Sequence, residues 1–203
     1  MTAIKICGIT RREDADAAVE WGANALGFVL WPSSPRHTTL EAIREIVRAL
    51  PPFVTPVGVF VSPSPDDLAE AAEAGVRLAQ VHGIVPTWLV GRSPLPILRA
   101  VHLSASAADA IEPESPDATV LLDAHDPIRQ GGTGTTVDWT RARAVSARRR
   151  IILAGGLTPS NVSEAIRTVK PYAVDVASGV EASPGVKDHE LLRRFITAVK
   201  ETE

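Results

Sequence analysis

The sequence predicts an α/β protein whose eight β/α units close into a (β/α)8 barrel, the TIM barrel. Short apolar runs alternate with amphipathic helical segments along all 203 residues, a length near the lower limit for this fold. Several runs, such as residues 57–61 and 151–153, are β-branched and apolar on both faces, which is typical of parallel strands covered by helices. The eight expected strands are residues 3–7, 24–30, 54–61, 77–82, 97–103, 118–123, 150–154 and 172–177.

Helix signals lie between the expected strands. Thr10, with a glutamate three residues later, predicts a capping box that opens the first helix. Ser64 and Thr158 each precede a proline, a common first helical residue, and Gly75 is placed to end the helix that Ser64 begins. Three apolar stripes are expected to be buried: Leu40, Ile43, Ile46, Val47 and Leu50; Val162, Ala165, Ile166 and Val169; and Leu191, Leu192, Phe195, Ile196 and Val199.

No linker, low-complexity tract or shift in composition marks a domain boundary, so residues 1–203 are expected to form a single domain. The segment 104–109 after the fifth strand is short and alanine-rich, and we expect at most a two-turn helix there. An open flavodoxin-like sheet is the alternative fold, although it usually needs fewer strands.

Composition and charge narrow the functional classes. Apolar residues make up 45% of the chain, charged residues 22%, and the net charge is −3. Without a basic stripe or an acidic tail, we expect no nucleic-acid or membrane partner and no obligate protein partner. One cysteine excludes an internal disulfide and a cysteine-rich metal site. Together with an apolar strand that starts within three residues of the first methionine, this predicts a cytoplasmic protein without a signal peptide.

Candidate catalytic side chains stand where strands end, at the rim where such barrels keep their chemistry. Cys7 ends the first strand, although a single free cysteine is more often a small buried apolar side chain. Alternation along the sixth strand turns Leu122 toward the helices and Asp123 toward the mouth, whereas Asp126 precedes a proline and favours a turn. Asp175 of the eighth strand faces inward in the same way and has either a functional or a purely structural role.

Glycine-rich turns follow three consecutive strands. Glycine lets backbone N–H groups approach an anion closely, and the loops after strands 7 and 8 are the usual phosphate site of these barrels. The expected phosphate-binding residues are Gly131, Gly132, Gly155, Gly156, Ser178 and Gly179.

Two further side chains lie in loops or at strand ends. In the loop after the second strand, Arg36 lies among prolines and is placed to bind a carboxylate with two parallel hydrogen bonds, unless it is merely solvated. His82 ends the fourth strand, and its role stays open.

A thiol, a carboxyl group, an arginine and a phosphate site around one mouth predict proton-transfer chemistry on a small molecule that carries a phosphate and a carboxylate. The sequence contains no metal-ligand cluster and no dinucleotide fingerprint, so we expect neither a metal nor a cofactor.

The same residues carry a resemblance to a known family, running in order from residue 3 to about residue 188. The motifs are Lys5-Ile6-Cys7-Gly8-Ile9-Thr10, Gly27-Phe28-Val29 through Ser34-Pro35-Arg36, Val57-Gly58-Val59-Phe60, Gln80-Val81-His82-Gly83, Leu121-Leu122-Asp123, Gly131-Gly132-Thr133-Gly134 with Asp138-Trp139, Leu153-Ala154-Gly155-Gly156-Leu157 and Asp175-Val176-Ala177-Ser178-Gly179-Val180-Glu181. The ordered set resembles phosphoribosylanthranilate isomerase of tryptophan biosynthesis. Thr135 and Ala177 depart from the lysine and serine that are common there.

The resemblance implies an Amadori rearrangement of N-(5′-phosphoribosyl)anthranilate, with Cys7 as general base and Asp123 as general acid. It also implies that Arg36 binds the anthranilate carboxylate and that Asp175 assists at the reacting centre. Because a free thiol is mostly neutral at pH 7, we expect the surroundings of Cys7 to activate it. Lys5 is a candidate source of positive charge, if it does not lie too deep in the barrel.

Three rivals remain. The aminoaldose isomerase of the histidine pathway typically has an aspartate where this chain has Cys7. A Schiff-base aldolase needs a buried lysine, for which Lys5 is the only tempting candidate. A non-catalytic sensor of a phosphorylated ligand needs the glycine turns but neither the acid nor the base.

Overall fold

The computed structural model describes residues 1–83, 85, 89, 91–102, 119–123 and 139–202. Eight parallel strands form a closed barrel in sequence order, in which β1 (Ala3–Cys7) pairs with both β2 (Ala25–Val29) and β8 (Ala173–Val176). The strands between them are β3 (Thr55–Val61), β4 (Leu78–His82), β5 (Ile97–His102), β6 (Val120–Asp123) and β7 (Ile151–Ala154). The predicted fold class is confirmed, and the flavodoxin-like alternative is wrong because the sheet closes on itself.

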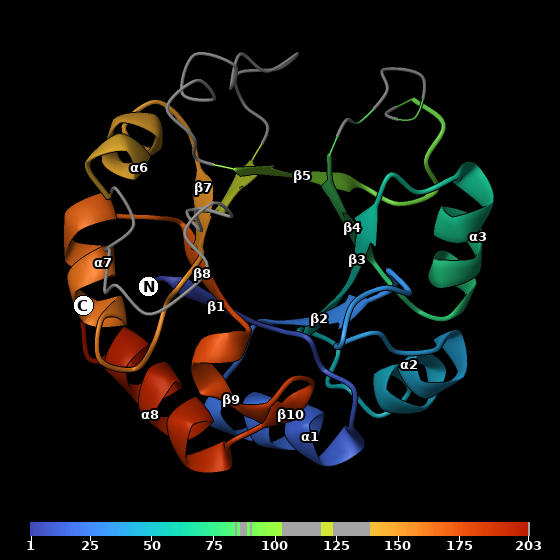
Figure 1. Ribbon diagram of the computed structural model, residues 1–203, viewed down its shortest axis with the longest axis horizontal. Coiled ribbons are helices and arrows are strands. Elements are labelled where there is room, and N and C mark those ends of the chain that lie inside the picture. The colour runs from blue at the N-terminus through green and yellow to red at the C-terminus, as the bar shows by residue number, and fades with distance from the viewer. Residues whose placement is uncertain (84, 86–88, 90, 103–118, 124–138, 203) are drawn as a thin grey trace.

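Helices surround the barrel (Figure 1). They are α1 (Arg12–Trp21), α2 (Leu40–Val47), α3 (Pro65–Glu73), α6 (Trp139–Ser146), α7 (Val162–Val169) and α8 (His189–Lys200). None of these described helices is both long and apolar enough to cross a membrane. The segment 104–109, expected to hold a short helix, lies outside the described residues.

After β8 the chain forms a short 3-10 helix, η1 (Ser178–Val180), and then an antiparallel hairpin of β9 (Glu181–Ser183) and β10 (Val186–Lys187). The hairpin lies beside α1 and α8 (Figure 1). The eight expected strands did not include it, although the Pro184-Gly185 turn between two short segments is a recognisable hairpin signal.

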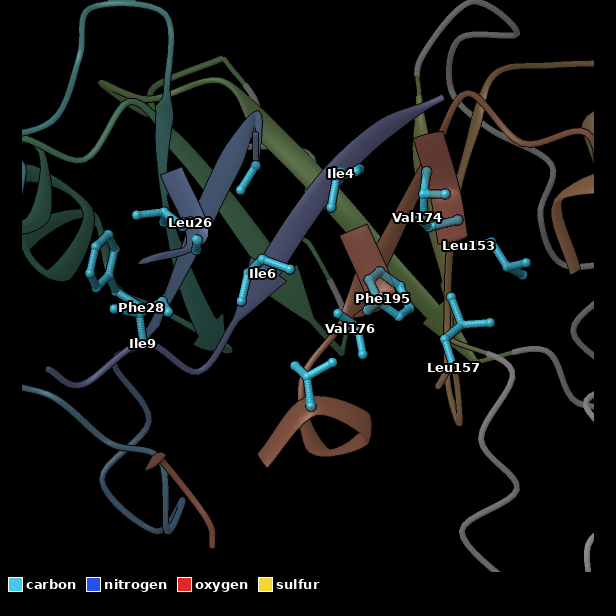
Figure 2. Close-up of a cluster of buried hydrophobic side chains, with 14 of the residues drawn as sticks. Ile4, Ile6, Ile9, Leu26, Phe28, Leu153, Leu157, Val174, Val176 and Phe195 are labelled. Carbon is cyan, nitrogen blue, oxygen red and sulfur yellow. The ribbon is translucent and has the colours of Figure 1, made fainter. Parts of the chain in front are cut away.

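Alternation along the strands separates two apolar layers. Side chains that leave the barrel pack under the helices, and Figure 2 shows Ile6 and Val176 of two neighbouring strands near Phe195 of α8. Inward-pointing side chains form a smaller interior cluster of Leu98, Ala100, Leu121 and Ala154. As predicted, Leu122 joins the outer layer, so the alternation turns the next residue toward the mouth. The three expected apolar stripes are buried or half-buried in the outer layer.

The predicted start of α3 is confirmed. Ser64 Oγ accepts a hydrogen bond from the backbone N–H of Asp67 at 3.2 Å, and the carboxylate of Asp67 accepts one from the Ser64 N–H at 2.8 Å. Gly75 follows the C-cap with a φ of +102°, a conformation that favours glycine, and so ends the helix as expected.

Two other predicted helix starts are wrong. The N-cap of α1 is Arg11 without a side-chain cap, because the Thr10 hydroxyl instead donates to the carbonyl of Gly185 at 2.5 Å. The N-cap of α7 is Asn161, three residues beyond Thr158, and its Oδ1 accepts a hydrogen bond from the Thr158 N–H at 2.8 Å. In each case a side chain stabilises a loop rather than the expected helix end.

Candidate active site

A cavity of about 660 Å³ opens at the carboxyl ends of the barrel strands. Around it lie all the described residues that the sequence analysis selected as catalytic, substrate-binding or phosphate-binding: Cys7, Arg36, Asp123, Asp175, Gly155, Gly156, Ser178 and Gly179. Gly131, Gly132 and Asp126 lie outside the described residues. A thiol, carboxyl groups, a guanidinium and glycine turns therefore share one site, as the positions of the strand ends predict.

Cys7 ends β1 with its side chain buried at the mouth, packed with Val29 and Val59 of the next two strands. Gly27 of β2 leaves the space that this thiol needs. A Cβ atom on Gly27 would lie 2.8 Å from Cys7 Sγ and 3.1 Å from Lys5 Nζ. The thiol and the ammonium group thus approach the same point, and a side chain at Gly27 would separate or displace them.

Lys5 faces the same side of β1 as Cys7 and forms an ion pair with Asp175, with 2.9 Å between Nζ and Oδ1. Both side chains are buried, at 4% and 8% exposure. The two residues are direct partners in the register of β1 and β8, where the chain closes the barrel. The ammonium group of Lys5 therefore lies beside the Cys7 thiol and is paired with Asp175.

Burial raises the pKa of the Cys7 thiol above its ordinary value, because the thiolate loses water. Lys5 and Lys187 lower this pKa, while the Asp175 carboxylate raises it. The expectation that the surroundings activate the thiol is therefore wrong in its net direction. The positive charges reduce the effect of burial without reversing it.

Arg36 does not stand free in its loop. Its Nε donates to the carboxylate oxygens of Glu181 at 2.9 and 3.1 Å, and its Nη2 donates to Glu181 Oε2 at 2.7 Å. Hydrogen bonding to Glu181 raises the pKa of the guanidinium. The reading of Arg36 as a merely solvated side chain is wrong, because it is fixed against β9.

Lys187 of β10 is a site residue that the sequence analysis missed. Its ammonium group donates to the carbonyl of Cys7 at 2.6 Å, to the carbonyl of Ala177 at 3.3 Å and to Glu181 Oε1 at 2.8 Å. The side chain is fully buried. The hairpin signal at Pro184-Gly185 was available, but the three acceptors become neighbours only when the barrel is closed.

The glycine turns after β7 and β8 meet at the rim. Gly155 and Gly156 have φ values of +90° and +64°, which favour glycine. A Cβ atom on Gly179 would lie only 1.9 Å from the carbonyl oxygen of Leu157, so the two loops pack backbone against backbone. This close approach gathers main-chain groups of both loops in one place, which is how such barrels bind phosphate.

His82 also lines the cavity, where its Nε2 lies 3.0 Å from Nε2 of Gln80. Asp123 ends β6, half-exposed at the cavity wall.

Within the part of the chain that the structure describes, no group of three or more histidine, cysteine, aspartate or glutamate side chains could hold a metal ion.

Comparison with known proteins identifies the family to which this barrel belongs. Residues 4–198 match the family model described as N-(5′phosphoribosyl)anthranilate (PRA) isomerase. An N-(5′-phosphoribosyl)anthranilate isomerase of Geobacter sp. (strain M21) is 46% identical over 201 residues, which cover 98% of each chain. The crystal structure of phosphoribosyl anthranilate isomerase from Thermotoga maritima superposes with a TM-score of 0.88 at 41% identity, covering 99% of this chain and 100% of that one.

A third relative was solved with a ligand. This phosphoribosyl anthranilate isomerase, in complex with reduced 1-(o-carboxyphenylamino)-1-deoxyribulose 5-phosphate, has a TM-score of 0.85 and 39% identity over 99% of this chain and all of its own. The match to the family model over nearly the whole sequence is decisive. The chain belongs to the N-(5′-phosphoribosyl)anthranilate isomerase family.

Proposed function

We propose that this protein catalyses the Amadori rearrangement of N-(5′-phosphoribosyl)anthranilate to 1-(2-carboxyphenylamino)-1-deoxyribulose 5-phosphate, a step of L-tryptophan biosynthesis. One observation carries the proposal: a single cavity is lined by a thiol, a carboxyl group on another strand, an arginine and two glycine turns. A substrate that carries a carboxylate at one end and a phosphate at the other matches that set of groups.

The reaction needs one acid and one base, which we assign to Asp123 and Cys7. Protonated Asp123 donates to the ring oxygen, the bond from that oxygen to C1′ breaks, and a protonated Schiff base forms between C1′ and nitrogen. The positive nitrogen acidifies the proton on C2′, and Cys7 thiolate removes it to give an enolamine. The enolamine gains a proton at C1′ and loses one from its C2′ hydroxyl, so the product is a ketone of unchanged composition.

Substrate binding is assigned to both ends of the molecule. The guanidinium of Arg36 donates hydrogen bonds to the anthranilate carboxylate, and the turns at Gly155, Gly156, Ser178 and Gly179 hold the phosphate. Anchoring both ends places C2′ near the thiol, and such positioning contributes much of the rate in enzymes of this kind. Gly131 and Gly132 are expected to contribute to the phosphate site.

Lys5 and Asp175 are assigned to the reacting centre through Cys7. The ammonium of Lys5 stabilises the thiolate, and Asp175 holds Lys5 beside it, as their 2.9 Å ion pair favours. Because burial raises the pKa of Cys7, the active thiolate depends on this nearby positive charge.

We expect the enzyme to use a phosphorylated small molecule and no cofactor, nucleic acid, membrane or obligate protein partner. The lone thiol at the site also favours a reducing compartment, the cytoplasm, where cysteine stays reduced.

The proposed acid–base pair is tested by following anthranilate fluorescence as freshly prepared phosphoribosylanthranilate is consumed. Wild-type protein should turn the substrate over, while Cys7→Ser and Asp123→Asn should each lose about 10²- to 10⁴-fold in kcat, the usual contribution of a general acid or base. Tight binding of the substrate without turnover by wild type would favour the sensor and would contradict the isomerase.

A further inference from the structure

Glu181 and Lys187 stand behind Arg36 on the hairpin that follows β8. We propose that both are positioning residues for the carboxylate of the ligand. Glu181 fixes the guanidinium of Arg36, while Lys187 fixes Glu181 and leaves the group with an excess positive charge. This inference rests on the proposed function, in which Arg36 meets the carboxylate.

The guanidinium of Arg36 is held at one edge and open at the other. Glu181 takes up the N–H on Nε and one N–H on Nη2, so that within the described residues the second N–H on Nη2 and both on Nη1 stay available. The aliphatic part of the side chain is confined as well, since a Cβ atom on Gly8 would lie 2.8 Å from Arg36 Cδ. The Arg36 side chain lines the cavity and is 24% exposed, so a ligand can reach its open edge.

Glu181 cannot easily release Arg36. Its side chain is 4% exposed, and its Oε1 also accepts hydrogen bonds from Lys187 Nζ at 2.8 Å and from the Gly185 N–H at 3.3 Å. Turning away would leave a buried carboxylate with fewer donors, which costs more than the lost bond alone. The carboxylate therefore serves as a fixed support for the guanidinium.

Lys187 supplies the charge balance. Its three acceptors, the carbonyls of Cys7 and Ala177 and the carboxylate of Glu181, match the three N–H donors of an ammonium group. Arg36 and Glu181 alone would be a neutral pair with little attraction for an anion. Burial lowers the pKa of Lys187, whereas the hydrogen bond to Glu181 raises it. With Lys187 protonated, the group carries one positive charge in excess, which the carboxylate of a ligand would neutralise.

The test separates affinity from chemistry. In Glu181→Gln, KM for phosphoribosylanthranilate should rise about 10- to 100-fold, the usual effect of losing a hydrogen bond to a charged group, while kcat changes less. Lys187→Met should raise KM by a similar factor. Because Lys187 also lowers the pKa of Cys7, kcat of this variant is compared with wild type at alkaline pH, where the thiol is ionised in both proteins. Glu190→Gln is the matched control, because Glu190 forms an exposed pair with Arg193 on α8. It should leave KM unchanged. If Glu181→Gln instead lowered kcat by this factor and left KM constant, the proposal would be overturned.

A variant cycle shows whether Glu181 acts through Arg36. Arg36→Met should raise KM by itself, and adding Glu181→Gln should then change KM by less than about twofold, because the group that Glu181 positions is gone. If Glu181→Gln raised KM by the same factor in the Arg36→Met protein as in wild type, Glu181 would act independently of Arg36, and the proposal would be overturned. Circular dichroism and urea unfolding establish that each variant is folded.

Two probes distinguish this inference from the proposed function. Calorimetry would compare reduced 1-(o-carboxyphenylamino)-1-deoxyribulose 5-phosphate with the same compound lacking the carboxylate. Wild type should prefer the carboxylated probe, and Glu181→Gln should lose most of that preference while still binding the other probe. Equal preference in both proteins would overturn the positioning role alone. Failure of wild type to bind either probe would overturn the proposed function and this inference with it.

Discussion

The charge state of Cys7 depends on opposing effects from a few individual residues. Burial and Asp175 raise the thiol pKa, while Lys5 and Lys187 lower it. Replacing Lys5 with methionine should therefore raise this pKa further and move the rise of kcat/KM with pH to more alkaline values. Replacing Asp175 with asparagine should move the rise toward lower pH, because it removes a negative charge.

Alkylation by iodoacetamide measures the thiolate directly, and Cys7 is the only cysteine that can react. The pH at which the alkylation rate rises should shift in opposite directions in the two variants. A shift in the same direction in both would contradict the assignment of Lys5 as the source of charge. Urea unfolding is needed alongside, since each change leaves a buried partner unpaired.

At the scale of elements, the loops after β7 and β8 pack so closely at Gly179 that no side chain fits between them. The Cβ atom of Gly179→Ala would lie 1.9 Å from the Leu157 carbonyl oxygen, so one loop must move. We expect a loss of about 1–3 kcal/mol in the free energy of unfolding, the usual cost of overpacking, together with weaker phosphate binding. Gly91→Ala is the control, because no atom of the described residues lies within 4 Å of its Cβ position. Urea titration of both variants measures the difference, and equal stability would contradict the close packing.

Asp14 connects α1 to β10 and α8. Its fully buried carboxylate accepts hydrogen bonds from Arg11 and from the backbone N–H of Lys187, and lies 2.9 Å from His189 Nε2 of α8. Burial alone would raise the pKa of Asp14, but these donors outweigh it and hold the pKa below its ordinary value.

A lowered pKa predicts how the stability provided by Asp14 changes with pH. Its contribution is fully present above the unfolded-state pKa of about 3.9 and is lost as the pH falls through the folded-state pKa. Asp14→Asn should therefore be less stable than wild type at pH 7, with the difference shrinking below about pH 4. Urea unfolding at both pH values measures this, and a difference that stayed constant would show that the charge of Asp14 is unimportant.

Local patterns predicted the elements better than their ends. The capping box at Ser64 was predictable because all of its partners lie within four residues. Thr10 carries the same signal, yet its hydroxyl binds Gly185, a residue 175 positions away. The side chain of a capping residue goes to the better partner, and only the folded chain determines which partner is near.

For the whole molecule, the eight strands were predictable because burial on both faces leaves a continuous apolar pattern. The positions of Cys7, Asp123 and Asp175 at the mouth followed from alternation and strand polarity. The chain of charges from Arg36 through Glu181 to Lys187 was not predictable, because it joins segments about 150 residues apart through a hairpin outside the barrel repeat. The net pKa shift of Cys7 also depends on burial that emerges only when β1 meets β8.

Closure of the barrel between its first and last strands places the groups that we assign to ligand binding, which come from both ends of the chain, around one cavity. A ligand that bridges them binds only the folded protein, so it should stabilise the whole barrel. Reduced 1-(o-carboxyphenylamino)-1-deoxyribulose 5-phosphate at 100 times its Kd should add about 2.7 kcal/mol. For a chain of this length that corresponds to a rise in Tm of about 5–10 °C.

Thermal unfolding with and without this compound measures the coupling between site and barrel. Cys7→Ser should show nearly the same rise, because the thiol is assigned to chemistry rather than to binding, whereas Arg36→Met should show a smaller one at the same concentration. The contrary result would be two unfolding transitions, the first at the same temperature with and without the compound. Part of the barrel would then unfold while the compound stayed bound. The site would then depend on only some of the strands, and closure between β1 and β8 would not be required to hold it together.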